Sequence, residues 1–310
     1  MKRSVDRRRV YHKRDRLKQL RAFGHAARLE SATRAAKYLE ISQPAVSLQI
    51  RELEHELEAL LFERRGPKIT LTPAGERLYA IAMPLIASMD RISETFAGGF
   101  EESVSHTLRI AAGPSATAFV LPPYLRRFRE EFPETRLWVK NALVREALKL
   151  LAVREADFVM GADEPVSREF SFHPAFAYRH VLIAPENHPL AGRQAVDIEE
   201  ATRYPAIVPP SETYLRQPEF SAARRFVAEA TVAMTTSGWG VIKHCVQAGL
   251  GIAVIPSMCL TVRDRLSVVP LREERGELTY GIFTRSDKAS LPRSAERFIR
   301  MMIPDFPERA

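Results

Sequence analysis

Residues 31–54 read SATRAAKYLEISQPAVSLQIRELE, and this stretch decides the fold of the N-terminal part of the chain. Ser31 can cap a first helix, which is rich in alanine and must end near Glu40. Ser42 can cap a second helix, and Pro44 is suited to the first turn of that helix. The stretch therefore predicts two short helices joined by a tight turn.

The second of these helices has two distinct faces. Apolar residues at 4-3-4 spacing predict its buried stripe: Val46, Ile50, Leu53 and Leu57. Pro44, Leu48 and Arg51 cluster on the opposite side. This arrangement is typical of a helix-turn-helix, whose second helix enters the major groove of DNA by its N-terminal end. An ordinary helical hairpin in an α domain explains the same spacing.

The stretch LLFERRGPKITLTPAGERL at residues 60–78 predicts a two-stranded wing followed by a helix. Its Gly66-Pro67 turn separates two short segments, and Thr72 with Pro73 can open the helix. The tip of the wing carries three cations that suit phosphates or a minor groove: Arg64, Arg65 and Lys68. The wing therefore adds to the evidence for DNA binding.

The helix that follows carries a heptad-like apolar stripe, which includes Leu78, Ile81, Leu85, Met89, Ile92 and Phe96. Such a stripe on a helix that leaves a small domain predicts dimerisation. Packing against the same chain is the alternative. Pro84 lies inside the helix and is expected to kink it.

Charge and composition limit the classes to which the protein can belong. The net charge of +8 lies in residues 1–21, which hold ten Lys or Arg and two Asp. This arm suits nucleic acid, although a solvated tail or a start codon assigned too far upstream explains it as well. No apolar run approaches the roughly 18 residues of a membrane span, and the basic start has no apolar region typical of a secretory signal. With only Cys245 and Cys259, the chain fits a reducing cytoplasm.

The second half predicts a different architecture. Residues 107–162 read as βαβαβ, a unit of a parallel sheet. A second series of strands and helices extends over residues 179–303 and predicts a second α/β lobe, with the chain crossing twice between the lobes. In open α/β sheets ligands bind beyond the carboxyl ends of strands. Ser115 and Thr117 follow the first strand, and residues 141–145 follow the second, so an anion or carboxylate is expected there. Simple helix capping is the alternative.

Residues 16–97 resemble the N-terminal region of LysR-type transcriptional regulators, through LKQLRAF, SATRAAKYLEISQPAVSLQIRELEHEL, LFERR and LTPAGERL in this order. The resemblance implies a winged helix-turn-helix, a linker helix and a periplasmic-binding-protein-like effector domain, α/β overall, in a homodimer or homotetramer. QAGLGIAVIP at residues 247–256 resembles the effector domain of the family. Leu48 stands where family members often carry Arg or another polar residue, and the arm before Arg16 extends beyond the usual start.

These inferences give a set of expected boundaries and residues. The expected parts are a basic extension (1–15), the winged helix-turn-helix (16–74), the linker helix (75–98), lobe I (106–177 and 274–310) and lobe II (178–273). The DNA-binding candidates are Thr33, Arg34, Ser42, Gln43, Pro44, Ser47, Leu48, Gln49, Arg51, Arg64, Arg65 and Lys68. The effector-binding candidates are Ser115, Thr117, Arg145, Pro210, Ser211, Thr236, Ser237 and Trp239. Thr236, Ser237 and Trp239 are expected to cap a helix of lobe II, although Trp239 suits a core equally well.

The expected function is a regulator that binds double-stranded DNA and responds to a small, anionic metabolite, with RNA polymerase as a further partner. No cofactor or metal is expected, since the histidines lack metal-ligand spacing. An enzyme would need a catalytic motif such as G-x-S-x-G or H-E-x-x-H, which the sequence lacks. A solute-binding protein would need an export signal. Redox sensing through Cys245 and Cys259 is the remaining alternative, although both thiols are expected to be buried.

Overall fold

The computed structural model describes residues 16–65, 68–90, 92, 107–210, 221–272, 277–286 and 291–306, without the side chains at 64, 65, 68, 88, 90 and 221. The basic extension, the tip of the wing and the end of the linker helix therefore lie outside the described residues. Internal contacts divide the chain into two units: residues 16–92 belong to the first, and residues 107–151 with 156–306 to the second.

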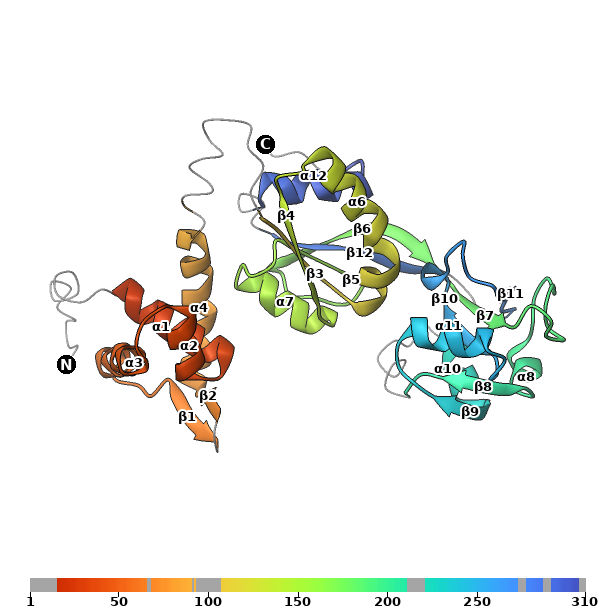
Figure 1. The fold of residues 1–310 in the computed structure, drawn as a ribbon, viewed down its shortest axis with the longest axis horizontal. Coiled ribbons are helices and arrows are strands. Elements are labelled where there is room, and N and C mark those ends of the chain that lie inside the picture. Colours follow the sequence, from red (N-terminus) through yellow and green to blue (C-terminus); the bar gives the residue numbers. More distant parts are fainter. Residues whose placement is uncertain are drawn as a thin grey trace. The chain divides into compact units, whose positions relative to one another are not determined.

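The first unit is a winged helix-turn-helix that continues into a long helix (Figure 1). Its elements are α1 (Arg16–Leu29), α2 (Ala32–Tyr38), α3 (Gln43–Leu57), β1 (Phe62–Arg65), β2 (Lys68–Leu71) and α4 (Pro73–Asp90). The strands β1 and β2 pair antiparallel, with Phe62 opposite Leu71 and Arg65 opposite Lys68. The predicted fold of this region is confirmed.

Side-chain caps set the starts of three helices, as the sequence predicts. The Ser31 hydroxyl accepts a hydrogen bond from the backbone N–H of Arg34 at 3.2 Å. The Ser42 hydroxyl accepts one from Ala45 at 3.3 Å, and the Thr72 hydroxyl accepts one from Gly75 at 3.1 Å. Each cap satisfies an N–H that the first helical turn leaves without a partner.

A small apolar core holds α3 against α1 and the wing. It contains Phe23, Val46, Leu53 and Leu61, all fully or almost fully buried. Leu57 was expected in the buried stripe, and this prediction is wrong, because its side chain is 40% exposed. The reason is local: α3 ends at Leu57, and the next residue adopts a left-handed conformation that turns the chain away.

The second unit begins with a five-stranded mixed sheet (Figure 1). Its strands are β3 (Thr107–Ala112), β4 (Arg136–Asn141), β5 (Phe158–Ala162), β6 (Phe170–Tyr178) and β12 (Leu278–Arg285), in the order β4-β3-β5-β12-β6. Both β4 and β5 run parallel to β3, which confirms the predicted βαβαβ unit. The associated helices are η1 (Ala116–Val120), α6 (Leu121–Glu131), α7 (Val144–Ala152) and α12 (Arg293–Met302). This part is called lobe I.

The rest of the second unit, called lobe II, contains smaller sheets. The strands β7 (His180–Ala184), β10 (Ala253–Pro256) and β11 (Ser267–Pro270) form an antiparallel sheet, whereas β8 (Pro205–Val208) and β9 (Thr231–Thr235) pair in parallel. The helices of this lobe are α8 (Ile198–Ala201), α10 (Ser221–Glu229), α11 (Trp239–Gln247) and η2 (Ser257–Cys259).

Two features of lobe I differ from the predicted elements. The first helix of the predicted βαβαβ unit is not α-helical throughout, because η1 is π-helical before α6 continues it. The strand β6 was not predicted, and it contains Pro174, a residue that is disfavoured inside a strand. It is tolerated because β6 is the end strand of the sheet and the pairing with β12 shifts register between Tyr280 and Gly281.

Candidate functional site

The N-terminal end of α3 exposes a compact polar and apolar surface. Gln43, Pro44 and Arg51 are exposed, and Leu48 is 57% exposed despite its apolar side chain. The Gln43 side-chain amide donates to the Ser47 hydroxyl at 2.7 Å, which aligns two hydrogen-bonding groups along the helix. Gln49 is half-buried at the flank. These side chains match what a helix needs to contact base edges and thymine methyl groups.

Half-buried carboxylates fix the orientation of α3. The Glu54 carboxylate accepts hydrogen bonds from the backbone N–H groups of Leu61 at 2.8 Å and Phe62 at 3.3 Å, so it ties the helix to the first strand of the wing. The Glu52 carboxylate accepts a hydrogen bond from the side-chain amide of Gln19, a buried residue of α1, at 3.0 Å. The exposed face is therefore presented by a rigid scaffold.

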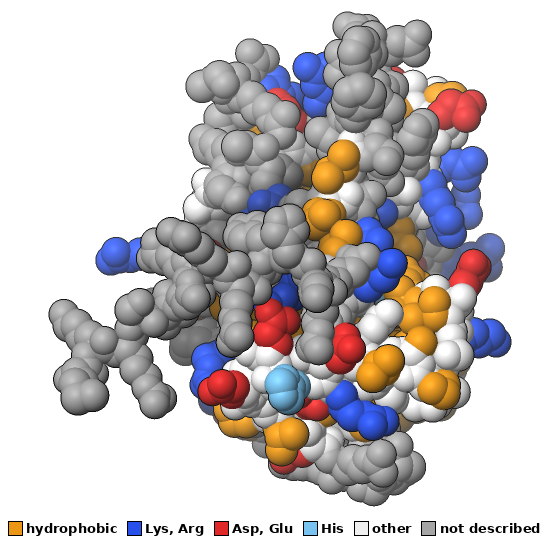
Figure 2. Space-filling model, turned by 90° about the vertical axis from the view of Figure 1, so that its left-hand side faces the viewer, with side chains coloured by type: hydrophobic (Ala, Val, Ile, Leu, Met, Phe, Trp, Pro, Cys, Tyr) orange, Lys and Arg blue, Asp and Glu red, His pale blue; other side chains and the backbone are white. Residues whose placement is uncertain are grey.

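The remaining DNA-binding candidates flank this face. Thr33, Arg34 and Ser42 are exposed at the start of α2 and in the turn before α3. The backbones of Arg64, Arg65 and Lys68 lie at the end of the β1–β2 hairpin that adjoins positions 66 and 67, although their side chains lie outside the described residues. On the face drawn in Figure 2, exposed hydrophobic side chains lie among Lys and Arg side chains.

The helix α4 has two apolar faces. Met83 and Ile86 are buried, and a methyl group added to Gly24 of α1 would lie 2.4 Å from the Met83 sulfur, so this face packs on α1. The predicted dimerisation stripe lies elsewhere on the helix. Leu78 is half-buried, but the next four members of the stripe are exposed by 44–65%: Ile81, Leu85, Met89 and Ile92. Phe96 lies outside the described residues. An apolar stripe of this size is suited to an interface.

In lobe I, the predicted effector residues follow β3 and β4. Because these strands are parallel and Ala112 pairs with Asn141, Ser115 and Arg145 lie at the same edge of the sheet. Thr117 does not offer free groups, because both its N–H, at 3.0 Å, and its hydroxyl, at 3.1 Å, donate to the Gly113 carbonyl. The hydroxyl bond runs from residue i to the carbonyl of residue i−4 within the helix, so it is not the helix cap that was the alternative. Arg145 is exposed on the first turn of α7.

In lobe II, the predicted residues precede α11. The expectation that Thr236, Ser237 and Trp239 cap this helix is wrong: Gly238 occupies the N-cap position with φ 88° and ψ 114°, without a side-chain cap. The chain adopts a positive φ at this N-cap position, and such a conformation favours glycine over residues with a side chain. Ser237 is exposed, and Trp239 packs against the lobe II core. Pro210 is half-buried, and Ser211 lies outside the described residues.

The two lobes touch where these segments meet. Phe119 of η1 lies within 4.0 Å of the position of a methyl group added to Gly240 of α11, so residues 115–119 lie beside the start of α11. Residues at the crossings are also joined. The Ser257 N–H donates to the Arg179 carbonyl at 2.7 Å, and the Arg179 N–H donates to the Ser257 hydroxyl at 3.2 Å.

A buried ion pair lies beside this contact. The Lys243 ammonium donates to both carboxylate oxygens of Asp264 at 2.7 and 2.9 Å and to the Cys259 carbonyl at 2.8 Å. It also lies 4.7 Å from the ring centre of Phe119, in a cation–π arrangement. Burial tends to raise the pKa of Asp264, but hydrogen bonds from Lys243 and Thr261 outweigh it and hold the pKa below its ordinary value.

No motif singles out Lys243 or Asp264 in the sequence. One signal was available: Lys243 stands four residues after Trp239 and three before Val246, on the buried side of α11. A lysine on an apolar stripe needs a partner. The partner lies 21 residues further on, and sequence spacing gives no means to identify it.

The cysteines have the character of structural thiols. Cys259 is fully buried, and burial raises its pKa to about 12 in spite of a hydrogen bond with the Ser115 side chain and the nearby Lys243. Cys245 is half-buried in the same apolar cluster. Since the thiolate is the reactive species, Cys259 is poorly suited to oxidant sensing.

Two further features are absent from the described residues. Among the described residues, no group of three or more His, Cys, Asp or Glu side chains could hold a metal ion. Nor does any helix in the described part of the chain have the length and apolar character needed to cross a membrane.

Comparisons with known proteins agree with this architecture. Residues 17–76 match the family model of the bacterial regulatory helix-turn-helix protein, lysR family, and residues 101–306 match that of the LysR substrate binding domain. The uncharacterized HTH-type transcriptional regulator YbhD of Escherichia coli K12 is 29% identical over 93% of this chain and 90% of its own. The RuBisCO operon transcriptional regulator of Allochromatium vinosum is 32% identical over 77% of this chain and 78% of its own.

Solved structures show the same fold. A full-length OxyR variant from Pseudomonas aeruginosa aligns with a TM-score of 0.72 at 23% identity, covering 96% of this chain and 100% of that one. Full-length CbnR in complex with its target DNA aligns with a TM-score of 0.61 at 18% identity, covering 93% of this chain and 99% of that one.

Proposed function

Because the chain belongs to the LysR-type transcriptional regulators, which bind DNA and small-molecule effectors, we propose which of its surfaces perform these tasks. In the proposal, the N-terminal end of α3 reads the major groove, the stripe on α4 joins two copies, and a small anionic metabolite binds between lobes I and II. The observation that carries the DNA-binding part is the exposed face of α3, held by buried contacts on its other side.

Four residues of the α3 face have a proposed role. Gln43 and Ser47 contact base edges, and their mutual hydrogen bond limits the rotamers that they sample before binding. Leu48 contacts a thymine methyl group, in place of the polar contact that an arginine would make. Arg51, together with the wing residues Arg64, Arg65 and Lys68, contacts phosphates.

The test of this part needs no known operator. Duplexes enriched from a random-sequence pool by the full-length protein are compared with scrambled duplexes by fluorescence anisotropy. Arg51→Ala is expected to weaken binding to both kinds of duplex and to lower the salt dependence by about one unit. The matched control is Arg224→Ala, at an exposed position on α10. If Arg51→Ala binds both duplexes as tightly as Arg224→Ala does, Arg51 does not contact DNA.

In the proposal, the exposed stripe of α4 forms the interface of the oligomer. A two-fold axis would bring Ile81, Leu85 and Met89 of two copies together and remove their apolar surface from water. The DNA target of such a dimer has two half-sites on one face of the duplex. We place the protein in the cytoplasm, where this DNA is found, and infer RNA polymerase as the partner through which it changes transcription.

The proposed effector site lies between residues 115–119 of lobe I and the start of α11 in lobe II. The support is the approach of Phe119 to Gly240, which places Ser115 near the N-terminal end of α11. That end presents backbone N–H groups and the exposed hydroxyl of Ser237. These groups favour an anion, because the helix dipole and the N–H donors act together. A ligand that contacts both lobes would stabilise their closed arrangement.

Thermal unfolding of the full-length protein with inorganic anions and small carboxylates tests the effector site. At least one anion is expected to raise the midpoint of the wild type, and Ser237→Ala is expected to reduce that shift. The matched control, Ser167→Ala, removes an exposed hydroxyl that bonds to Glu169 at 2.9 Å. An anion that stabilises Ser237→Ala as much as the wild type would place the effector elsewhere.

A further inference from the structure

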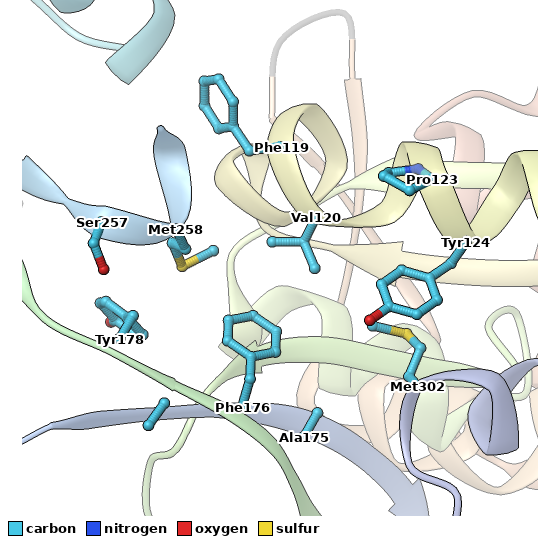
Figure 3. A pocket seen from close by; sticks show the side chains of 11 residues that line it. Phe119, Val120, Pro123, Tyr124, Ala175, Phe176, Tyr178, Ser257, Met258 and Met302 are labelled. Carbon is cyan, nitrogen blue, oxygen red and sulfur yellow. The ribbon is translucent and has the colours of Figure 1, made fainter. Parts of the chain in front are cut away.

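Lobe I carries a pocket whose walls differ in chemistry from the proposed effector site. Its volume is about 460 Å³, within the range of small-molecule sites. Lobe I contributes η1, the first turn of α6, β6 and the end of α12, and lobe II contributes η2 (Figure 3). Figure 3 shows Tyr124 beside Met302 at one end, Tyr178 near Ser257 at the other, and Phe176 between them.

The lining is aromatic, sulfur-containing and uncharged. Its large side chains are Phe119, Tyr124, Phe176, Tyr178, Met258 and Met302. The eleven lining residues include no Lys, Arg, His, Asp or Glu, so a carboxylate would meet no opposite charge there. Hydroxyl groups are present at both ends, on Tyr124 and on Ser257. Such walls suit a flat, uncharged aromatic molecule with a single polar substituent.

Two irregularities of the backbone form opposite walls of this pocket. One wall is η1, a π-helical turn, which is a feature that frequently marks functional sites. The other is a β-bulge: Tyr280 pairs with Phe176 and Gly281 with Pro174, so Ala175 is the extra residue. Bulges are over-represented beside binding sites, where they redirect side chains. The bulge also requires Gly281, since a methyl group there would lie 2.3 Å from the His173 carbonyl oxygen.

The pocket is connected to the contact between the lobes. Phe119 and Met258 line it and also pack against the apolar cluster of lobe II that contains Ile242 and Val246. The ring of Phe119 covers the Lys243 ammonium at 4.7 Å. A ligand in the pocket would therefore hold η1 and η2 together from the side of lobe I.

We propose that this pocket is a second ligand site of the effector domain, specific for an uncharged aromatic molecule of about two fused rings. It goes beyond the proposed anion site, since it takes an uncharged ligand and shares only Phe119 with that site. A molecule bound there supports the contact of Phe119 with Lys243 and so favours the arrangement of the lobes seen in this structure.

The probes that test the proposal are 1-naphthol and 1-naphthoate, which share a ring system and differ in charge. Titration calorimetry on the full-length protein is expected to show that 1-naphthol binds roughly tenfold or more tightly than 1-naphthoate, because burying an unpaired carboxylate is unfavourable. The blocking variant is Ala177→Trp, at an exposed lining position on β6 that leaves the core unchanged. The matched control is Ala248→Trp, exposed at the end of α11 and outside the pocket.

Ala177→Trp is expected to weaken 1-naphthol binding by about tenfold or more, while Ala248→Trp keeps the wild-type affinity. Thermal unfolding of both variants checks that each is folded, and Met302→Ala, which widens the pocket from the side of α12, gives a second perturbation. The proposal is overturned if 1-naphthoate binds as tightly as 1-naphthol or if Ala177→Trp binds like the wild type. It is also overturned if the wild type binds no 1-naphthol and Ala177→Trp weakens self-association, because a second copy then occupies the pocket.

Discussion

Replacement of Leu85 by aspartate tests the proposed role of α4 in self-association. Leu85 lies in the middle of the exposed stripe, between Ile81 and Met89, and is itself 58% exposed. In a two-fold dimer the substitution would place one carboxylate from each copy in the seam. It leaves the buried face of α4, with Met83 and Ile86, unchanged.

The magnitude follows from the exposure of this side chain. Complete burial of a leucine contributes about 1.5–3 kcal/mol, so burial of the exposed part of Leu85 contributes roughly 1–1.5 kcal/mol per copy. Two copies give about 2–3 kcal/mol, which corresponds to a loss of dimer affinity of about 30- to 150-fold. The carboxylates add to this loss, because neither finds a partner in an apolar seam.

Sedimentation velocity over a range of protein concentrations measures the effect. Leu85→Asp is expected to sediment as a smaller species at concentrations where the wild type is fully associated. The matched control is Leu250→Asp, which introduces the same charge at a leucine that is 53% exposed after α11. If Leu85→Asp associates as tightly as the wild type, the stripe on α4 does not form the seam and the reasoning is refuted.

Three further outcomes are expected. Lys243→Met should lower the free energy of unfolding by roughly 2–4 kcal/mol at neutral pH, because it leaves the largely shielded Asp264 carboxylate without its cation. The pKa of Asp264 is held below its ordinary value of 3.8, so this stabilisation is present above that pH and is lost as the pH falls below it. In chemical denaturation, the difference in stability between wild type and variant should therefore shrink below about pH 4. Gly75→Ala should destabilise the first unit by about 1–3 kcal/mol in the same assay, because the new methyl group would lie 2.1 Å from the Leu61 carbonyl oxygen; an unchanged midpoint would mean that the backbone moves freely there. Cys259→Ser should leave any effect of mild oxidants on DNA binding, measured by anisotropy, unchanged, because burial already keeps the thiol protonated. If an oxidant response of the wild type disappears in this variant, redox sensing through Cys259 is supported instead.

The elements of the first unit were predictable because their signals are local. A capping serine and a proline within two residues of it set the start of α3, and apolar spacing identified its buried face. The same reasoning placed Leu57 in the core, since periodicity continues to the last residue of a helix. It gives no information about Glu58, whose left-handed conformation ends the stripe one turn early.

The features of the second unit that escaped prediction depend on contacts between distant residues. Strand β6 contains Pro174 and exists because β12 pairs with it more than a hundred residues later in the chain. The π-helical turn η1 differs from an α-helix by one residue in the hydrogen-bond pattern, which composition does not encode. The Lys243–Asp264 pair joins residues 21 positions apart within lobe II, and the pocket requires the two lobes to be assembled.

Selection of DNA sequences by the Leu48→Arg variant tests whether α3 reads DNA through its exposed face. Wild type and variant each enrich duplexes from the same random pool, and the two consensus sequences are compared position by position. The account predicts a change from thymine to guanine at a single base pair in each half-site, because arginine donates to guanine N7 and O6 where leucine contacts a methyl group. The affinity difference at that position should be roughly 1–3 kcal/mol. Identical consensus sequences for the two proteins would contradict the claim.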